Sequence, residues 1–282
     1  MSIKQLVSGA AAAIVVAIGI PLSALAASNT VTVTQQNQQG WSAAELNSGA
    51  TIKYITDATS PAPSGALQLT TDATTASKAQ YLHAANTPLA AITSLSYYTK
   101  QVSASFAQGD ASYQLPTCLL GLNAPKTADN PSGCNGYTTL VFEPYHNGAV
   151  TPGAWQKWDV YAGKLWSSKT LSSGACSVVA GGGGAPFYSL AALKTACPNA
   201  VVGGFGVNIG SNNPSYNVET DLVNFNGTTY DFQITNVPTN KDQCKKDGYL
   251  NYTDGSAVTF KNQGSCVSYV NDASSTQSES EF

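Results

Sequence analysis

Charged residues are scarce in this chain of 282 residues. Asp, Glu, Lys and Arg make up only 10% of it, and the formal net charge is −3. Proteins that bind nucleic acid neutralise its phosphates with many basic side chains. The largest basic group here, Lys241, Lys245 and Lys246, is too small for that and is expected to be a solvated helix face. We therefore expect no nucleic-acid partner.

The common catalytic and metal-binding motifs are also missing. A zinc site of the usual spacing is excluded, because the chain has no C-x-x-C pair and only two histidines, His83 and His146. No G-x-S-x-G occurs, and the glycine run 181–184 lacks the Lys-Ser or Lys-Thr that ends a phosphate loop. No cofactor is implied. The sequence favours a binding protein over an enzyme.

Long hydrophobic runs are confined to the N-terminus. Residues 5–26 carry no charge, with an apolar centre at 10–20, a break at Pro21 and the sequence Ala24-Leu25-Ala26. A basic start, an apolar middle and an A-x-A end are typical of a secretory signal peptide. We expect residues 1–26 to be removed, with an uncleaved anchor as the alternative. The protein is then secreted or on the cell surface, with no membrane contact after cleavage.

Six cysteines are present, and an even number in an exported chain indicates disulfides. Of the 15 connectivities that six cysteines allow, sequence order suggests the simplest. The predicted bonds are Cys118–Cys134, Cys176–Cys197 and Cys244–Cys266.

Alternation of polar and apolar residues dominates the middle of the chain and predicts strands. Strands are expected at 30–34, 51–55, 66–69, 80–83, 94–99, 113–122, 137–142, 201–209, 218–225 and 228–232. Residues 155–161 and 164–168 are expected to form a hairpin around Ala162-Gly163, and Asn226-Gly227 is a type I′ hairpin signal. One helix is expected at 190–196, capped by Ser189. Without a βαβ rhythm, residues 27–236 predict a mainly β, antiparallel, jelly-roll-like sandwich.

The character of the sequence changes after Phe232. Thr239 can cap a helix over 240–247, and a second short helix is expected at 266–270. Residues 237–270 would then be a small helical hairpin stapled by Cys244–Cys266, since a unit of this size buries little surface. Residues 271–282 are rich in Ser, Gln and Glu and are expected to be a disordered tail.

Three segments, 87–98, 155–166 and 217–232, together resemble concanavalin-like and carbohydrate-binding-module-like jelly rolls. The segments KDQCKK (241–246) and FKNQGSCVSYV (260–270) resemble a C-terminal segment of uncharacterised secreted bacterial proteins. The first resemblance implies a β-sandwich that binds glycans. Neither resemblance supplies a catalytic residue.

The carboxylates give little support for hydrolysis. Glycosidases with this kind of fold carry E-x-D-x-E on one strand, but here Glu219 and Asp221 are followed by Val223. Asp221 could instead hold a loop or a structural Ca²⁺. Glu143 and His146 could form an acid–base pair, but their spacing indicates a strand end with Tyr145 and His146 exposed. A glycoside hydrolase is the third-ranked function.

Aromatic residues are the best binding signal, with 14 Tyr and four Trp in a weakly charged chain. Aromatic rings stack on sugar faces. The candidate ligand contacts are Tyr97, Tyr145, His146, Trp155 and Trp166. The first-ranked function is recognition of a glycan or another cell-surface component. The alternative is a structural or adhesive surface protein that binds another protein, for example through the C-terminal hairpin.

Overall fold

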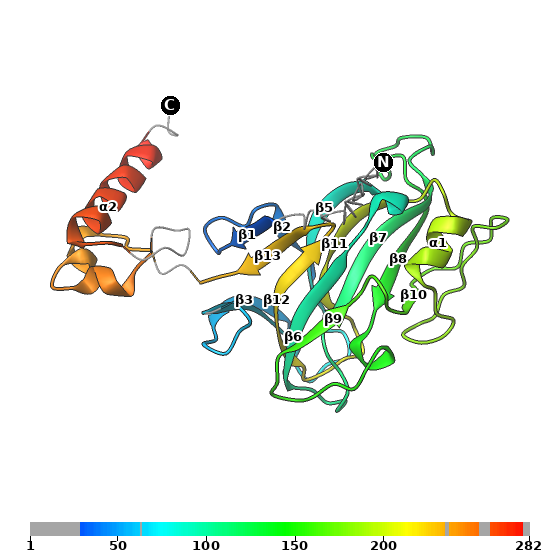
Figure 1. Ribbon diagram of the computed structural model, residues 1–282, viewed down its shortest axis with the longest axis horizontal. Helices are drawn as coiled ribbons and strands as arrows, with labels where there is room; N and C mark the ends of the chain where they lie inside the picture. The colour runs from blue at the N-terminus through cyan, green and yellow to red at the C-terminus, as the bar shows by residue number, and fades with distance from the viewer. Residues whose placement is uncertain (1–28, 63, 235–236, 254–259, 279–282) are drawn as a thin grey trace, which may run out of the picture.

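The computed structural model describes residues 29–62, 64–234, 237–253 and 260–278. The expected signal peptide lies outside these ranges. Two β-sheets form the body of the molecule (Figure 1). None of the helices in the described ranges has the length and apolar character needed to cross a membrane.

Sheet A has seven strands, and sheet B has six. Sheet A contains β1 (Asn29–Val33), β13 (Thr228–Phe232), β12 (Asn217–Phe225), β4 (Gly65–Thr70), β3 (Thr51–Thr56), β6 (Leu95–Ser103) and β9 (Gln156–Asp159). Sheet B runs in the order β10 (Leu165–Ser167), β8 (Asn135–Phe142), β7 (Ser112–Gly121), β11 (Val201–Ile209), β5 (Ala79–Pro88) and β2 (Trp41–Leu46). Neighbouring strands are antiparallel except β1 and β13, which are parallel. The predicted β-sandwich is therefore confirmed.

The core lies between the two sheets because the apolar positions of the alternating strands all point inward. Trp41 of β2 is almost fully buried and illustrates the packing. Its ring stacks on Tyr81 at 5.5 Å and meets Phe232 of sheet A edge-on at 5.0 Å. Fully burying a large apolar side chain contributes about 1.5–3 kcal/mol, so this cluster holds the sheets together.

Several local predictions are confirmed. The chain turns between β12 and β13 at Asn226 and Gly227, with φ of +51° and +90°. Helix α1 (Leu190–Ala196) begins after Ser189, whose Oγ accepts a hydrogen bond from the Ala192 N–H at 3.1 Å. The three disulfides pair as predicted from sequence order. Structural disulfides indicate that the chain folds in an oxidising compartment.

The predicted hairpin at 155–168 is wrong. β9 pairs with β6 in sheet A, whereas β10 pairs with β8 in sheet B. Between them the chain crosses from one sheet to the other around Ala162-Gly163, with the buried Val160 anchoring the crossing. Strand β2 was not predicted, because WSAAEL has five exposed positions after Trp41 and no apolar alternation.

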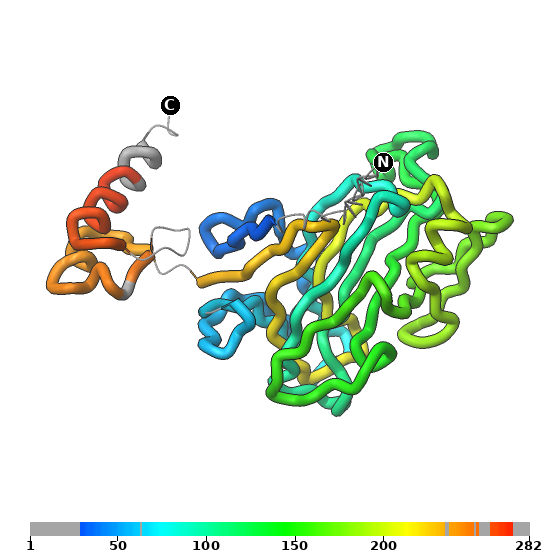
Figure 2. Tube along the Cα trace, in the orientation of Figure 1, coloured from blue at the N-terminus to red at the C-terminus, as the bar shows by residue number. Residues whose placement is uncertain are grey.

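The C-terminal segment forms a small separate unit beyond the end of β13 (Figures 1 and 2). It contains the 3-10 turns η3 (Lys241–Cys244) and η4 (Gly248–Asn251) and helix α2 (Gln263–Ser278). Its own core consists of Cys244, Phe260, Cys266 and Val270. The stapled helical segment is thus present, but its first half is two short turns. Helix α2 also continues through residues 271–278, where a disordered tail was expected, and residues 279–282 lie outside the described ranges.

Candidate functional site

A groove of about 690 Å³ crosses the outer face of sheet B. Strands β5, β7, β8, β10 and β11 supply its floor, and the loops around Phe106 and Gly183 flank it. The volume lies within the range typical of small-molecule sites. We therefore consider this groove as the candidate functional site in the described part of the chain.

Glycines occupy outward positions of β11 in sheet B. Phe205 and Val207 point into the core, so Gly204 and Gly206 occupy the outward positions of the strand. A Cβ added to Gly206 would lie 2.2 Å from the carbonyl oxygen of Tyr81. The β11 and β5 backbones approach so closely here that only glycine fits.

A row of polar side chains crosses the groove. Asn208 of β11 pairs with Gln80 of β5 on one side and with Ser112 of β7 on the other. One register step beyond the Tyr113–Phe142 pair, Glu143 stands next to Ser112. Paired residues share a sheet face, and strands lie about 4.8 Å apart, so the row of four spans about 14 Å. This is long enough for more than one sugar ring.

Two buried polar atoms in the groove have no hydrogen-bond partner among the described residues. The Asn208 amide is 5% exposed and donates through Nδ2 to Ser112 Oγ at 3.4 Å, but its Oδ1 has no donor. The Trp166 indole N–H has no acceptor. Gln80 Nε2 donates to Gln114 Oε1, which fixes both amides. A buried polar group left unpaired costs about 1–3 kcal/mol, so these atoms are suited to pairing with a ligand.

Aromatic residues form the walls. Phe106 and Tyr137 are 49% and 47% exposed, and Phe106 packs edge-on against Tyr145 at 5.5 Å. The Tyr145 hydroxyl donates to the Gly183 carbonyl at 2.9 Å, and His146 Nε2 lies 2.7 Å from the same oxygen. These bonds hold the glycine loop 181–184 against the groove.

One end of the groove is acidic. Glu143 is half-buried and lies near Asp110, Tyr145, Trp166 and Tyr216. Burial raises the pKa of Glu143 to about 8, and the nearby Asp110 adds to the rise. Burial also raises the pKa of Asp110 to about 7. The Asp110 carboxylate accepts hydrogen bonds from Thr99 Oγ1 at 2.5 Å and the Ala111 N–H at 2.8 Å.

The five predicted contact residues lie in four different places. Trp166 and Tyr145 lie together in the groove. His146 lies behind Tyr145, with its ring between Tyr145 and Phe187. Tyr97 has no exposed surface, and its hydroxyl donates to the Ala111 carbonyl inside the sandwich. Because Tyr97 is on the inward face of β6, it cannot touch a ligand, and that prediction is corrected.

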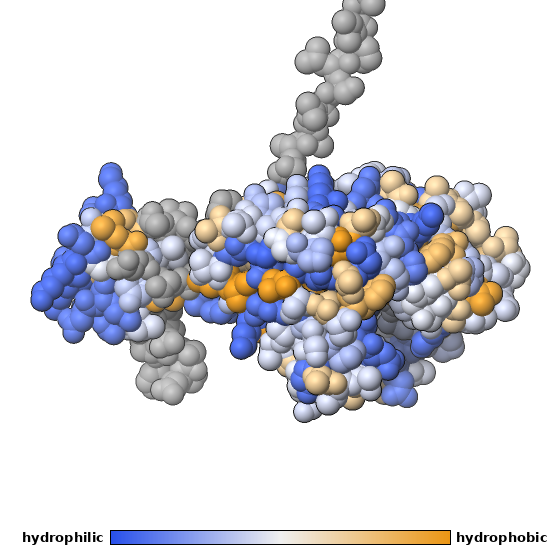
Figure 3. All heavy atoms as spheres, turned by 90° about the horizontal axis from the view of Figure 1, so that it is seen from below, coloured by the Kyte–Doolittle hydropathy of each residue, from blue (hydrophilic) through white to orange (hydrophobic). Residues whose placement is uncertain are grey.

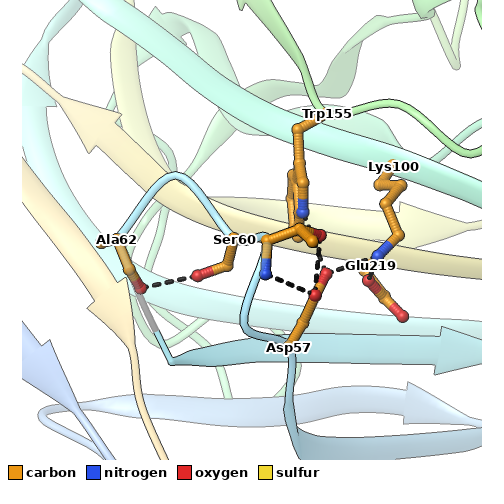
Figure 4. A network of polar contacts seen from close by, with 7 residues as sticks. Asp57, Ser60, Ala62, Lys100, Trp155 and Glu219 are labelled. Atoms are coloured by element: carbon orange, nitrogen blue, oxygen red, sulfur yellow. Dashed lines mark hydrogen bonds and ion pairs between the residues drawn. The ribbon is translucent and has the colours of Figure 1, made fainter.

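Trp155 directly precedes β9 of sheet A and does not line the groove; its side chain lies beside Asp57 and Lys100 (Figure 4). Its indole N–H donates to Asp57 at 3.0 Å, and its ring lies over the Lys100 ammonium. Lys100 pairs with both Asp57 and Glu219, the latter at 2.6 Å. Burial raises the pKa of Asp57, but the hydrogen bonds from Lys100 and Thr59 outweigh this effect and hold that pKa well below its usual range. Trp155 therefore covers a structural ion-pair network.

Asp221 was considered for a structural Ca²⁺. Its Oδ1 accepts hydrogen bonds from the Leu222 and Phe232 N–H groups at 2.7 and 2.9 Å. The carboxyl thus braces the bend where β12 changes its partner from β4 to β13. Within the described ranges, no three His, Cys, Asp or Glu side chains lie together as a metal site. A calcium ion at Asp221 stays a prediction.

Gln80, Gln114 and Asn208 are not among the contact residues predicted from the sequence. The available signal was an amide inside an otherwise apolar strand, since each of the three is flanked on both sides by buried residues. That signal identifies a buried polar position. It does not show that three strands far apart in sequence bring these positions together.

Solved structures that are similar to this chain share little sequence with it. A family 11 carbohydrate-binding module of the cellulosomal cellulase Lic26A-Cel5E of Clostridium thermocellum matches at 9% identity and a TM-score of 0.36. The match covers 66% of this chain and 86% of that one. A family 11 module from the same organism, in complex with a β-1,3-1,4-mixed-linked tetrasaccharide, matches at 11% identity and a TM-score of 0.37, covering 67% and 89%.

A third match comes from carbohydrate-binding modules of the β-sandwich superfamily, described as promiscuous in specificity. It has 9% identity and a TM-score of 0.28, and covers 66% of this chain and 56% of that one. No family model and no curated protein matches the sequence.

Proposed function

We propose that this protein is exported and binds a neutral oligosaccharide in the groove on sheet B. The observation that carries the proposal is the polar row of Gln80, Asn208, Ser112 and Glu143, which contains an unpaired buried acceptor and lies beside aromatic rings. Sugars present hydroxyl groups to amides and flat C–H faces to aromatic rings. The groove offers both kinds of contact.

The charges of the groove favour a neutral ligand. Its two lysines already have partners, because Lys78 pairs with Glu45 and Lys169 lies over the Tyr137 ring at 4.9 Å. Lys169 keeps its charge near Tyr137, but no described cation pairs with Asp110 or Glu143, so an anionic group at their end of the groove would meet no counter-charge. Neutral sugars need no counter-charge.

Binding is favoured over cleavage because the two carboxyl groups differ in access. Glycoside hydrolysis uses two carboxyl groups that both reach the scissile bond. Glu143 is partly exposed, but Asp110 is only 5% exposed and already accepts two hydrogen bonds. One accessible carboxyl suits a hydrogen-bonding contact.

A glycan array with variants tests this function. We expect the purified protein to bind neutral oligosaccharides and Trp166→Ala or Asn208→Ala to weaken binding about ten-fold or more, which corresponds to losing one well-placed buried contact. Trp155→Ala is the matched control, because it removes an equally large ring from sheet A. Equal loss in Trp155→Ala and Trp166→Ala, or no binding to any neutral glycan, would contradict the proposal.

A further inference from the structure

Glu143 occupies a distinct position at the end of the polar row. It directly follows β8, and Pro144 begins the 3-10 turn η2 (Pro144–His146) immediately after it. The register of β7 and β8 sets it beside Ser112 on the groove face. Its side chain therefore reaches a ligand that lies along the row.

No cation faces Glu143. The titratable groups around it are Asp110 from the loop before β7, Tyr145 from η2, Tyr216 from the loop before β12, and Tyr97 of β6 beneath it. No ion pair joins Glu143 to a lysine or histidine in the described part of the chain. Neighbouring His146 is turned toward Gly183. Because nothing compensates a negative charge here, the neutral carboxyl is favoured.

Trp166 stands next to this carboxyl. Burial raises the pKa of Glu143, and the polar interaction of the Trp166 side chain with the carboxylate opposes that rise. The indole N–H nevertheless reaches no acceptor at hydrogen-bonding geometry among the described residues. A protonated carboxyl also carries an O–H donor. Two donors, one from Glu143 and one from Trp166, thus lie side by side at this end of the groove.

We propose that protonated Glu143 and Trp166 form a paired donor subsite for an oxygen acceptor of the bound sugar, so that glycan binding is linked to protonation of Glu143. This inference rests on the proposed function. Binding is strong while Glu143 keeps its proton and weakens as pH rises through about 8, where burial sets the pKa of the carboxyl. Ionisation removes one donor and places a negative charge beside the acceptor, and we expect a loss of about ten-fold in affinity.

Two measurements test the subsite. The first needs no glycan and follows tryptophan fluorescence of the whole protein between pH 5 and 10. We expect a transition near pH 8 that is absent in Glu143→Gln and in Trp166→Phe, and present in Trp155→Phe. The proposal would be overturned if the wild-type curve lacked this transition, or if the transition persisted in Glu143→Gln.

The second measurement is the array of neutral oligosaccharides at pH 6 and pH 9. The wild-type signal should fall at pH 9, whereas Glu143→Gln, which is always neutral and keeps a donor, should bind equally at both values. A wild-type signal independent of pH overturns the subsite and leaves the proposed function intact. A blank array at both values, with the fluorescence transition present, overturns the proposed function and with it the ligand role of Glu143.

Discussion

Asp221 is a fully buried carboxyl group at the bend of β12. Burial raises its pKa to about 8, against the hydrogen bond from the Phe232 N–H. A raised native pKa means that the folded state binds the proton more tightly than the unfolded state, so its contribution to stability falls as pH rises from about 4 to about 8. We expect the urea midpoint to be lower at pH 8.5 than at pH 5. The fall should be smaller in Asp221→Asn, which cannot ionise.

The same variant tests the calcium prediction. If Ca²⁺ binds the Asp221 carboxylate, adding Ca²⁺ at pH 8.5 should raise the wild-type urea midpoint, because a ligand of the native state stabilises it by mass action. The Asp221→Asn midpoint should not respond. A midpoint that is the same with Ca²⁺ and with a chelator would show that the carboxyl only braces the bend.

Strand β11 contributes Asn208 to the groove, and two of its glycines offer a matched pair of stability tests. A Cβ on Gly206 would lie 2.2 Å from the backbone oxygen of Tyr81, whereas a Cβ on Gly203 would meet nothing nearer than 3.7 Å. We expect Gly206→Ala to lower the free energy of unfolding by roughly 1–3 kcal/mol, as overpacking in a close-packed region does. Gly203→Ala should change it much less. If both substitutions changed the free energy of unfolding in urea equally, the β5 and β11 backbones could separate at Gly206 without loss of stability.

Element-scale features also show what the sequence could predict. Alternation located most strands, and Asn226-Gly227 identified its hairpin, because both signals are local. The partner of a strand is not local information. The segments at 155–161 and 164–168 are neighbours in sequence, yet the inward packing of Trp158 and Leu165 directs them to opposite sheets.

The candidate site was predicted only in part for the same reason. Trp155 precedes β9 and Trp166 lies within β10, and their local sequences do not distinguish a cover for Lys100 from a wall of the groove. Glu143 was weighed only against His146, its neighbour in sequence. Its actual neighbours, Asp110 and Tyr216, come from segments that the sheet topology brings together.

At the scale of the whole molecule, hydrophobic residues lie in small patches over the face shown in Figure 3. Large contiguous apolar patches mark protein or membrane interfaces. This face gives no sign of such an interface.

The molecule also has two separate hydrophobic cores, one in the sandwich and one in the C-terminal unit. All four tryptophans lie in the sandwich, so tryptophan fluorescence reports its unfolding alone. Replacing Cys244 and Cys266 by serine removes the only disulfide of the C-terminal unit. Such a small core depends on a covalent staple, and we expect amide hydrogens in 240–270 to lose protection from exchange.

The sandwich should not respond to that change. Its tryptophan-detected urea midpoint and its glycan binding should equal those of the wild type, because the two cores do not share residues. The matched control is the double substitution of Cys118 and Cys134 by serine, since Cys118 lies on β7 within sheet B. That variant should lose about 3 kcal/mol of stability, the usual effect of opening a loop of this length. A lower tryptophan midpoint in the Cys244/Cys266 variant would instead mean that the C-terminal unit stabilises the sandwich.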